Sequence, residues 1–130
     1  MASKLFLFLA LSFCTLSSCR ENDLRRGNAD IIKTALDWGG LAALPEDAKI
    51  VSAKSAGSAF TREVIVVFTC SKESIDKWIQ ASKRLKNNIP GHIALNVYRY
   101  EILPGEEGSV GGKVDVDYST GIVLIDISWS

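Results

Sequence analysis

The stretch Lys113–Trp129, KVDVDYSTGIVLIDISW, decides the fold of this chain of 130 residues. Apolar and polar residues alternate on both sides of a four-residue loop, Tyr118–Gly121, which is the pattern of a β-hairpin. Gly121 can take the left-handed conformation that closes such a loop, so we expect Asp117 to pair with Ile122. The same register sets Val116 against Val123, Val114 against Ile125 and Lys113 against Asp126.

The predicted hairpin has one apolar face and one polar face, because side chains alternate between the two sides of a strand. The apolar face is expected to be buried and carries Val114, Val116, Val123, Ile125, Ile127 and Trp129. The solvated face carries Lys113, Asp115, Asp117 and Asp126. A second layer of structure must therefore cover the apolar face.

Two helices are predicted before the hairpin. The first begins at Asn28, a candidate N-cap, and ends at Gly39-Gly40 after apolar residues at helical spacing. The second spans residues 71–85 and is capped by Ser71. Its apolar face carries Ile75, Trp78, Ile79 and Leu85. This face is suited to cover a sheet.

Three further strands are predicted. Residues 49–54 (KIVSAK) form a first strand, which ends in a turn over residues 55–58. Residues 63–69 (EVIVVFT) are almost continuously apolar, which is typical of a central strand covered on both faces. Residues 94–103 (ALNVYRYEIL) alternate less cleanly, so we expect both faces of this strand to be partly covered.

Together these elements predict an α+β fold with two layers. We expect an antiparallel sheet of four to five strands, with the helix over residues 71–85 packed on one face. The N-terminal helix lies nearby, and the C-terminal β-hairpin completes the sheet. The length from residue 28 to residue 130 suits a single domain with one core.

The N-terminus has the pattern of a cleaved export signal. Lys4 supplies a positive charge, Leu5–Phe13 (LFLFLALSF) an apolar segment, and Leu16–Cys19 (LSSC) small residues before a cysteine. The last stretch resembles the signal of bacterial lipoproteins. The resemblance implies cleavage before Cys19, attachment of diacylglycerol to its sulfur, and acylation of the new amino group by a fatty acid such as palmitate.

This resemblance also implies how the chain is divided and where it resides. Residues 1–18 would be the signal peptide, residues 19–27 the acylated cysteine and a charged tether, and residues 28–130 the folded domain. A lipid anchor would hold the protein to a membrane of the cell envelope. Arg20 stands where an aspartate retains such proteins on the inner membrane, which implies the outer membrane, facing the periplasm, in a diderm cell.

Two other interpretations of the N-terminus stay open. An uncleaved membrane helix would need about 20 apolar residues, more than the unbroken apolar segment contains. An ordinary secretory signal would leave Cys19 as a thiol able to form a disulfide with Cys70. In the lipoprotein interpretation Cys14 is removed and Cys19 is alkylated. Cys70 is then a single thiol, expected to be buried and inert.

The charge balance argues against binding to nucleic acid. The chain contains 15 basic and 15 acidic residues, so no excess of positive charge attracts a polyanion. We therefore expect no nucleic-acid partner. Attachment to the membrane would come from acyl chains and not from a basic surface.

One spacing resembles a calcium-binding loop. Asp115, Asp117 and Ser119, followed by Asp126, have the oxygen spacing of the helix-flanked type. Thr120 occupies the position that needs glycine, and the flanking segments are predicted strands. We therefore expect a solvated hairpin face and no bound metal.

The residues needed for two other chemistries are sparse. His92 is the only histidine, and no serine lies in a Gly-x-Ser-x-Gly elbow, so a serine hydrolase has no visible framework. Beside Pro90-Gly91, His92 is expected to lie in a loop. One histidine and one free cysteine are too few for a usual zinc site. We expect neither a metal nor a cofactor.

Two remaining features have structural interpretations. Residues 105–112 are rich in glycine but lack the pattern of a phosphate-binding loop, so they are expected to connect elements flexibly. An aromatic set could form a recognition surface, although its spacing favours core positions and sheet covers. It comprises Trp78, Tyr98, Tyr100 and Trp129.

These observations predict a non-enzymatic, membrane-anchored binding or structural module with a protein partner. One alternative is a tethered domain that binds a small ligand or solute in an aromatic concavity between helix and sheet. Another is an enzyme that uses Asp115, Asp117 or Glu101 as acid or base.

Overall fold

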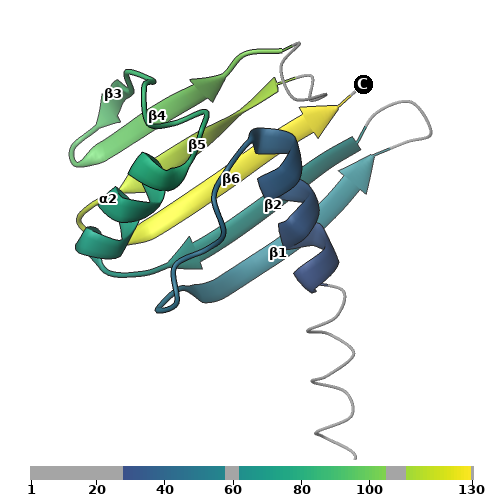
Figure 1. Ribbon diagram of the computed structural model, residues 1–130, viewed down its shortest axis with the longest axis horizontal. Coiled ribbons are helices and arrows are strands. Elements are labelled where there is room, and N and C mark those ends of the chain that lie inside the picture. Colours follow the sequence, from purple (N-terminus) through teal and green to yellow (C-terminus); the bar gives the residue numbers. More distant parts are fainter. Residues whose placement is uncertain (1–27, 58–61, 105–110, 130) are drawn as a thin grey trace, which may run out of the picture. The chain divides into compact units, whose positions relative to one another are not determined.

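The part of the chain that the structure describes forms an open antiparallel sheet of six strands with helices over one face (Figure 1). The computed structural model describes residues 28–57, 62–104 and 111–129. The strands are β1 (Lys49–Gly57), β2 (Arg62–Thr69), β3 (Gly91–Ala94), β4 (Val97–Ile102), β5 (Gly111–Asp117) and β6 (Ile122–Trp129), and helix α2 spans Lys72–Ala81. The strand order is β1-β2-β6-β5-β4-β3. The expected α+β class is confirmed, with six strands where four to five were predicted.

Residues 31–130 form one compact unit, and residues 1–30 form another. Of residues 1–30 the structure describes only residues 28–30. The signal peptide, Cys19 and the tether lie outside the described residues, as does most of the glycine-rich loop. The boundaries at residues 18, 27 and 28 therefore stay predictions.

The C-terminal hairpin has the predicted register. Asp117 pairs with Ile122, and the pairs further along β5 and β6 follow as expected. Gly121 has a φ of 72°, and its N–H donates to the Asp117 carbonyl at 2.9 Å. A Cβ at this position would also lie 2.6 Å from the Cys70 carbonyl oxygen. Both the conformation and the close approach therefore require glycine.

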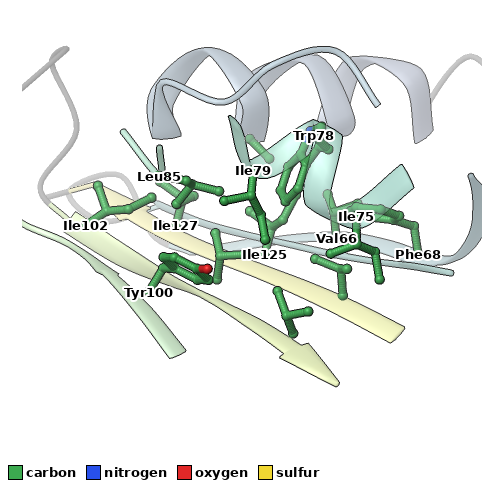
Figure 2. Packing of buried hydrophobic residues seen from close by; sticks show 14 of the residues in the cluster. Val66, Phe68, Ile75, Trp78, Ile79, Leu85, Tyr100, Ile102, Ile125 and Ile127 are labelled. Atoms are coloured by element: carbon green, nitrogen blue, oxygen red, sulfur yellow. The ribbon is translucent and has the colours of Figure 1, made fainter. Parts of the chain in front are cut away.

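The core lies between one face of the sheet and α2 (Figure 2). Alternate residues of β2, β4 and β6 point toward Ile75, Trp78 and Ile79 of the helix, and alternate residues of β5 belong to the same buried cluster. The rings of Trp78 and Phe68 meet edge to face with 5.4 Å between the centroids. The sheet contributes Val64, Val66, Phe68, Tyr100, Ile102, Val114, Val116, Val123, Ile125 and Ile127. Trp129, expected among them, is 43% exposed at the end of β6.

The opposite face of the sheet is only half-buried. Ile65 and Val67 of β2 alternate with the buried residues of that strand, and Leu124 has the same position on β6. The prediction that residues 63–69 are covered on both faces is therefore wrong. β-branched residues continue through β2 because they suit a pleated strand even where one side is open.

Helix α2 begins where expected and ends early. Ser71 is the N-cap and accepts a hydrogen bond from the Ser74 N–H at 3.3 Å. The helix ends at Ala81 and not at Leu85, because the backbone of Ser82 is extended, although its N–H still donates to the Ile79 and Trp78 carbonyls. Its hydroxyl donates to the Trp78 carbonyl at 2.8 Å and accepts from the Ala42 N–H at 3.0 Å.

The N-terminal helix covers residues 28–39. Asn28 already has helical structure, so its predicted place ahead of the helix is wrong. The helix ends as expected: Gly40 has a φ of 61°, and the Leu41 N–H donates to the Leu36 carbonyl at 2.9 Å. This is a Schellman ending, which favours glycine. Ala35 of this helix lies in the core.

Two strand predictions need correction. β1 continues to Gly57 through the turn expected at residues 55–58. The single strand expected over residues 94–103 is two strands, β3 and β4, with Asn96 between them at a φ of 63°. Asparagine tolerates this left-handed conformation, which lets the chain reverse. His92, expected in a loop, consequently lies in β3.

Truncation of one core side chain should destabilise the protein more than truncation of its neighbour. Ile125 is fully buried and Leu124, next to it on β6, faces the half-open side. We expect Ile125→Ala to lower the free energy of unfolding by about 2–5 kcal/mol, and Leu124→Ala by less than half as much. Urea denaturation measures both. Equal losses would contradict the assignment of the two faces.

Candidate functional site

The edge of β4 is only partly covered by its neighbour β3. β3 pairs with Val97, Tyr98 and Arg99, and it does not continue alongside the rest of β4. The Glu101 carbonyl accepts a hydrogen bond from Asn88 Nδ2 at 2.7 Å, and the Leu103 carbonyl accepts one from Arg84 Nη2 at 2.6 Å. These carbonyls are two residues apart and face the same edge of the sheet. The two side chains therefore donate the hydrogen bonds that backbone N–H groups would supply if β3 were longer.

The chain after α2 carries these two side chains to the edge. The Leu85 and Lys86 N–H groups both donate to the Ser82 carbonyl at 3.0 Å, which forms a turn. The Leu85 side chain is buried in the core. The Arg84 N–H also donates to the Gly40 carbonyl at 3.3 Å. The segment is therefore fixed by its backbone, and its polar side chains reach β4.

A groove of about 750 Å³ lies between this segment and the β3–β4 hairpin. Aliphatic side chains stand open to solvent along it: Ile89 is 90% exposed and Leu103 is 69% exposed. Such a gathering of exposed apolar groups marks many interaction sites. The groove is lined by Arg84, Asn87, Asn88, Ile89, Gly91, Ile93, Arg99, Glu101, Ile102 and Leu103. We call it the β4-edge groove.

An ion pair stiffens one wall of the β4-edge groove. Arg99 on β4 lies opposite Asp115 on β5, and its Nε and Nη2 donate to the two carboxylate oxygens at 2.8 and 2.9 Å. The hydrogen bond to Asp115 raises the pKa of the guanidinium. A second hollow of about 280 Å³ is also lined by Arg99 and Glu101, and it continues to Lys113 and Asp126.

Three of the aromatic residues that the sequence singled out fall into two groups, and the fourth, Trp129, is exposed at the end of β6. Trp78 and Tyr100 are buried in the core, as their spacing indicated. Tyr98 stacks on His92 with 5.0 Å between the ring centroids, and the edge of Tyr118 meets Tyr98 at 5.9 Å. These rings contact one another at the ring surfaces that a flat ligand would need. The cluster therefore packs the ends of the hairpins together.

Tyr118 also connects the hairpin loop to α2. Its hydroxyl donates to Asp76 Oδ1 at 3.0 Å, and the Lys72 ammonium lies 5.6 Å from the ring centroid. Burial, followed by the hydrogen bond to Asp76, raises the pKa of the phenol. The phenol therefore stays protonated at neutral pH and donates this bond.

At the N-terminal end of α2, side chains of the protein accept hydrogen bonds from the backbone N–H groups. Asp47 Oδ2 accepts a hydrogen bond from the Ser71 N–H at 3.0 Å. This bond lowers the pKa of the Asp47 carboxyl. Cys70, expected to be buried, is half-buried, and burial together with Asp47 raises the pKa of its thiol. The thiol form, which is a poor nucleophile, is thereby favoured.

The carboxylates with calcium-like spacing do not converge. Asp115 bonds to Arg99, and Asp126 lies opposite Lys113 on the sheet. Asp117 Oδ1 accepts from the Ser119 N–H at 2.9 Å and from its hydroxyl, and these bonds lower the pKa of Asp117. Among the described residues, no three acidic, histidine or cysteine side chains gather as they would around a metal ion.

Sequence reasoning did not find the β4-edge groove. Two signals were present: the apolar residues Ile89, Ile93 and Leu95, and Asn96 as a candidate turn between two strands. The residue chosen from the sequence, Cys19, lies outside the described residues. Glu101, considered as an acid or base, is an exposed residue of the groove lining.

Comparisons of the chain with models of protein families, with curated proteins and with solved structures give no match. Within residues 28–57, 62–104 and 111–129, no helix combines the length and apolar character needed to cross a bilayer. The proposed function therefore rests on the residues of this chain alone.

Removal of the Asp47 carboxylate should change the pH dependence of stability. Because its folded pKa lies below the ordinary 3.8, the ionised form stabilises the fold above that value, and this contribution is lost as the pH falls from 3.8 through the folded pKa. We expect the stability difference between wild type and Asp47→Asn to stay constant from about pH 6 to pH 5 and to shrink as the pH falls from about 4 to 2. Urea midpoints measured across this range test it.

The Glu46→Gln variant removes an exposed carboxylate from the same turn and controls for loss of charge alone. Parallel pH curves for wild type and Asp47→Asn would contradict the role given to the bond with Ser71.

Proposed function

We propose that this protein is a lipid-anchored, non-enzymatic binding module of the bacterial cell envelope. In this proposal Cys19 carries the acyl chains, and the β4-edge groove binds a segment of a partner protein. The observation that carries the binding role is the exposure of Ile89, Ile93 and Leu103 along one groove. In a diderm cell the domain would face the periplasm from the outer membrane.

The distribution of exposed apolar side chains supports this site. In the described part of the chain, half of the exposed large hydrophobic residues come from the short stretch 89–103. They are Ile89, Ile93, Leu95 and Leu103, whereas the others are Ile50, Val51, Ile122 and Trp129. A cluster of this kind loses unfavourable contact with water when a partner covers it.

The anchor and the groove have separate physical roles. Each buried methylene of an acyl chain contributes about 0.8 kcal/mol, so two or three chains hold the protein without help from its surface. The surface of the domain then stays available for a partner. The charged stretch 20–27 suits a tether between the two parts.

A small ligand is the second candidate for the same groove. Its volume of about 750 Å³ falls within the range of ligand pockets. We propose no catalytic role for the carboxylates. Asp115 is held by Arg99, and the lowered pKa of Asp117 favours its ionised form, which cannot act as an acid and is a weaker base than an ordinary carboxylate.

The anchor is tested by the mass of the protein extracted from membranes. We expect a mass that corresponds to residues 19–130 with diacylglycerol and a further acyl group on Cys19, because the signal resembles that of lipoproteins. The Cys19→Ser variant should lose these groups and leave the membrane fraction. An unmodified cysteine in the wild-type protein would remove the anchoring proposal.

The binding role is tested by photocrosslinking in intact membranes. A photoreactive residue at position 93, in the groove, should give a discrete, saturable adduct with a protein. The same residue at position 51 is the matched control, because Val51 is exposed on the opposite edge strand. The Gly91→Leu substitution should abolish the adduct, because an added side chain meets only the Arg99 carbonyl, 4.0 Å from its Cβ, and fills the groove.

Equal adducts from positions 93 and 51, or an adduct unaffected by Gly91→Leu, would show that the groove is not the binding site. A groove that binds a small ligand would give no protein adduct.

A further inference from the structure

The sheet face opposite α2 carries an apolar patch across β2 and β6. Ile65, Val67 and Leu124 are half-buried there, and Ile122 is 37% exposed. These four residues are called the open-face patch. Helix α2 and residues 31–39 lie over the other face (Figure 1). Within the described part of the chain, one face of the sheet therefore has a helical layer and the other does not.

Opposite charges flank the open-face patch on its two sides. On β1, Lys49 and Lys54 lie in register with open-face residues of β2, so both belong to this face, and both are exposed. On β5, Asp115 and Asp117 alternate with the buried residues of that strand and face the same side. The charge of Asp115 is matched by Arg99, which leaves Asp117. The β1 side of the patch is therefore positive, and the β5 side is negative.

This arrangement complements itself about a two-fold axis. The axis runs parallel to the strands between β2 and β6, which are neighbours in the sheet. It sets β2 of one copy against β6 of the other, and β1 against β5. Because Val67 and Leu124 share one register row, the rotation places each against the other across the interface. Lys49 and Asp117 share another row, through Thr69 and Ile122, so they also meet.

The second lysine of β1 meets a row of mixed charge. Lys54 lies in the register row that continues through Ile65 to β6, β5 and β4. The same rotation sets it against one basic and two acidic residues of the other copy, namely Glu101, Lys113 and Asp126. The excess charge of this row is negative. Both lysines of β1 therefore meet net negative charge on a second copy.

The size of this face fits a weak dimer. β2 and β6 have eight residues each. At about 3.3 Å per residue and about 4.8 Å between strands, the four strands β1, β2, β6 and β5 offer on the order of 500 Å² per copy. Two copies would bury about 1,000 Å², which is typical of weak and transient interfaces. We expect a dissociation constant on the order of 10 μM.

We propose that the open-face patch binds the same patch of a second copy of this chain. The two sheets pack face to face, about 10 Å apart, and the helices of both copies stay on the outside. The β4-edge groove lies on β3 and β4, beyond the patch, so this inference does not rest on the binding role of the groove. A different protein on the patch is the competing occupant.

Sedimentation equilibrium of the full, detergent-extracted protein tests the proposal at matched detergent density. Wild type should pass from monomer to dimer near about 10 μM. Leu124→Lys should weaken the dimer at least about tenfold, because it places a charge in the middle of the interface. Within one chain the new side chain lies opposite Asp115, which favours the fold. Leu95→Lys makes the same change at a residue that is 83% exposed outside the patch, and should leave association within about twofold.

Two charge reversals test the geometry of the dimer. Lys49→Glu sets like charges against each other in its own dimer, and so does Asp117→Lys, so each should associate about tenfold more weakly. An equimolar mixture of the two variants again pairs opposite charges at both contacts and should recover association within about threefold. In one chain β1 and β5 are about 14 Å apart, so recovery on mixing arises between copies. The lost bonds of Asp117 with Ser119 are lost in the mixture too and cannot cause the recovery.

Several outcomes would overturn the proposal. These are a wild-type protein that stays monomeric up to about 1 mM, a dimer that Leu124→Lys leaves unchanged, or a mixture that associates no better than either variant alone. A wild-type monomer whose photoreactive residue at position 67 crosslinks to another protein would assign the patch to that partner. Any adduct of position 51 with a second copy has twice the mass of the chain, so it stays distinct from the adduct of position 93. If the dimer forms and the crosslink from position 93 fails, only the proposed function falls.

Discussion

Trp78 on α2 makes the contacts on which the rest of the molecule depends. Its ring meets Phe68 of the sheet, its Nε1 donates to the Ala42 carbonyl at 2.9 Å, and its own carbonyl accepts from Ser82. One residue therefore joins the sheet, the connector before β1 and the end of the helix. Because Ser82 is held in this way, α2 ends and the chain turns toward β4. The groove exists at that edge because the helix stops where it does.

The local parts of the fold could be predicted from the sequence. The register of the C-terminal hairpin follows from a short loop, one glycine and strict alternation, so neighbouring residues suffice to define it. The cap at Ser71 is similarly local. Residues 94–103 were predicted wrongly because Ala94 and Leu95 extend the apolar pattern across a reversal. Asn96, a residue typical of turns, was the sequence signal of that reversal, and its φ of 63° lets the chain turn there.

The candidate site could not be predicted, because it combines segments that are distant in the sequence. The helical spacing continues from Ile79 to Leu85, and Leu85 is indeed buried, but it reaches the core from a turn. Nothing local indicates that Arg84 and Asn88 will meet the carbonyls of β4. The proposed lipoprotein signal would be the opposite case, because a processing enzyme would read such a linear pattern before the chain folds.

The position of β6 has a consequence for how the protein is made. This strand is the last in the chain, yet it lies between β2 and β5 and pairs with both. Until β6 is in place, the hairpin β1–β2 and the meander β3–β4–β5 have no strand to join them. Each then presents an unpaired inner edge that other chains can bind. The sheet therefore closes only when β6 enters between its two halves, so both halves gain their inner neighbour in the same step.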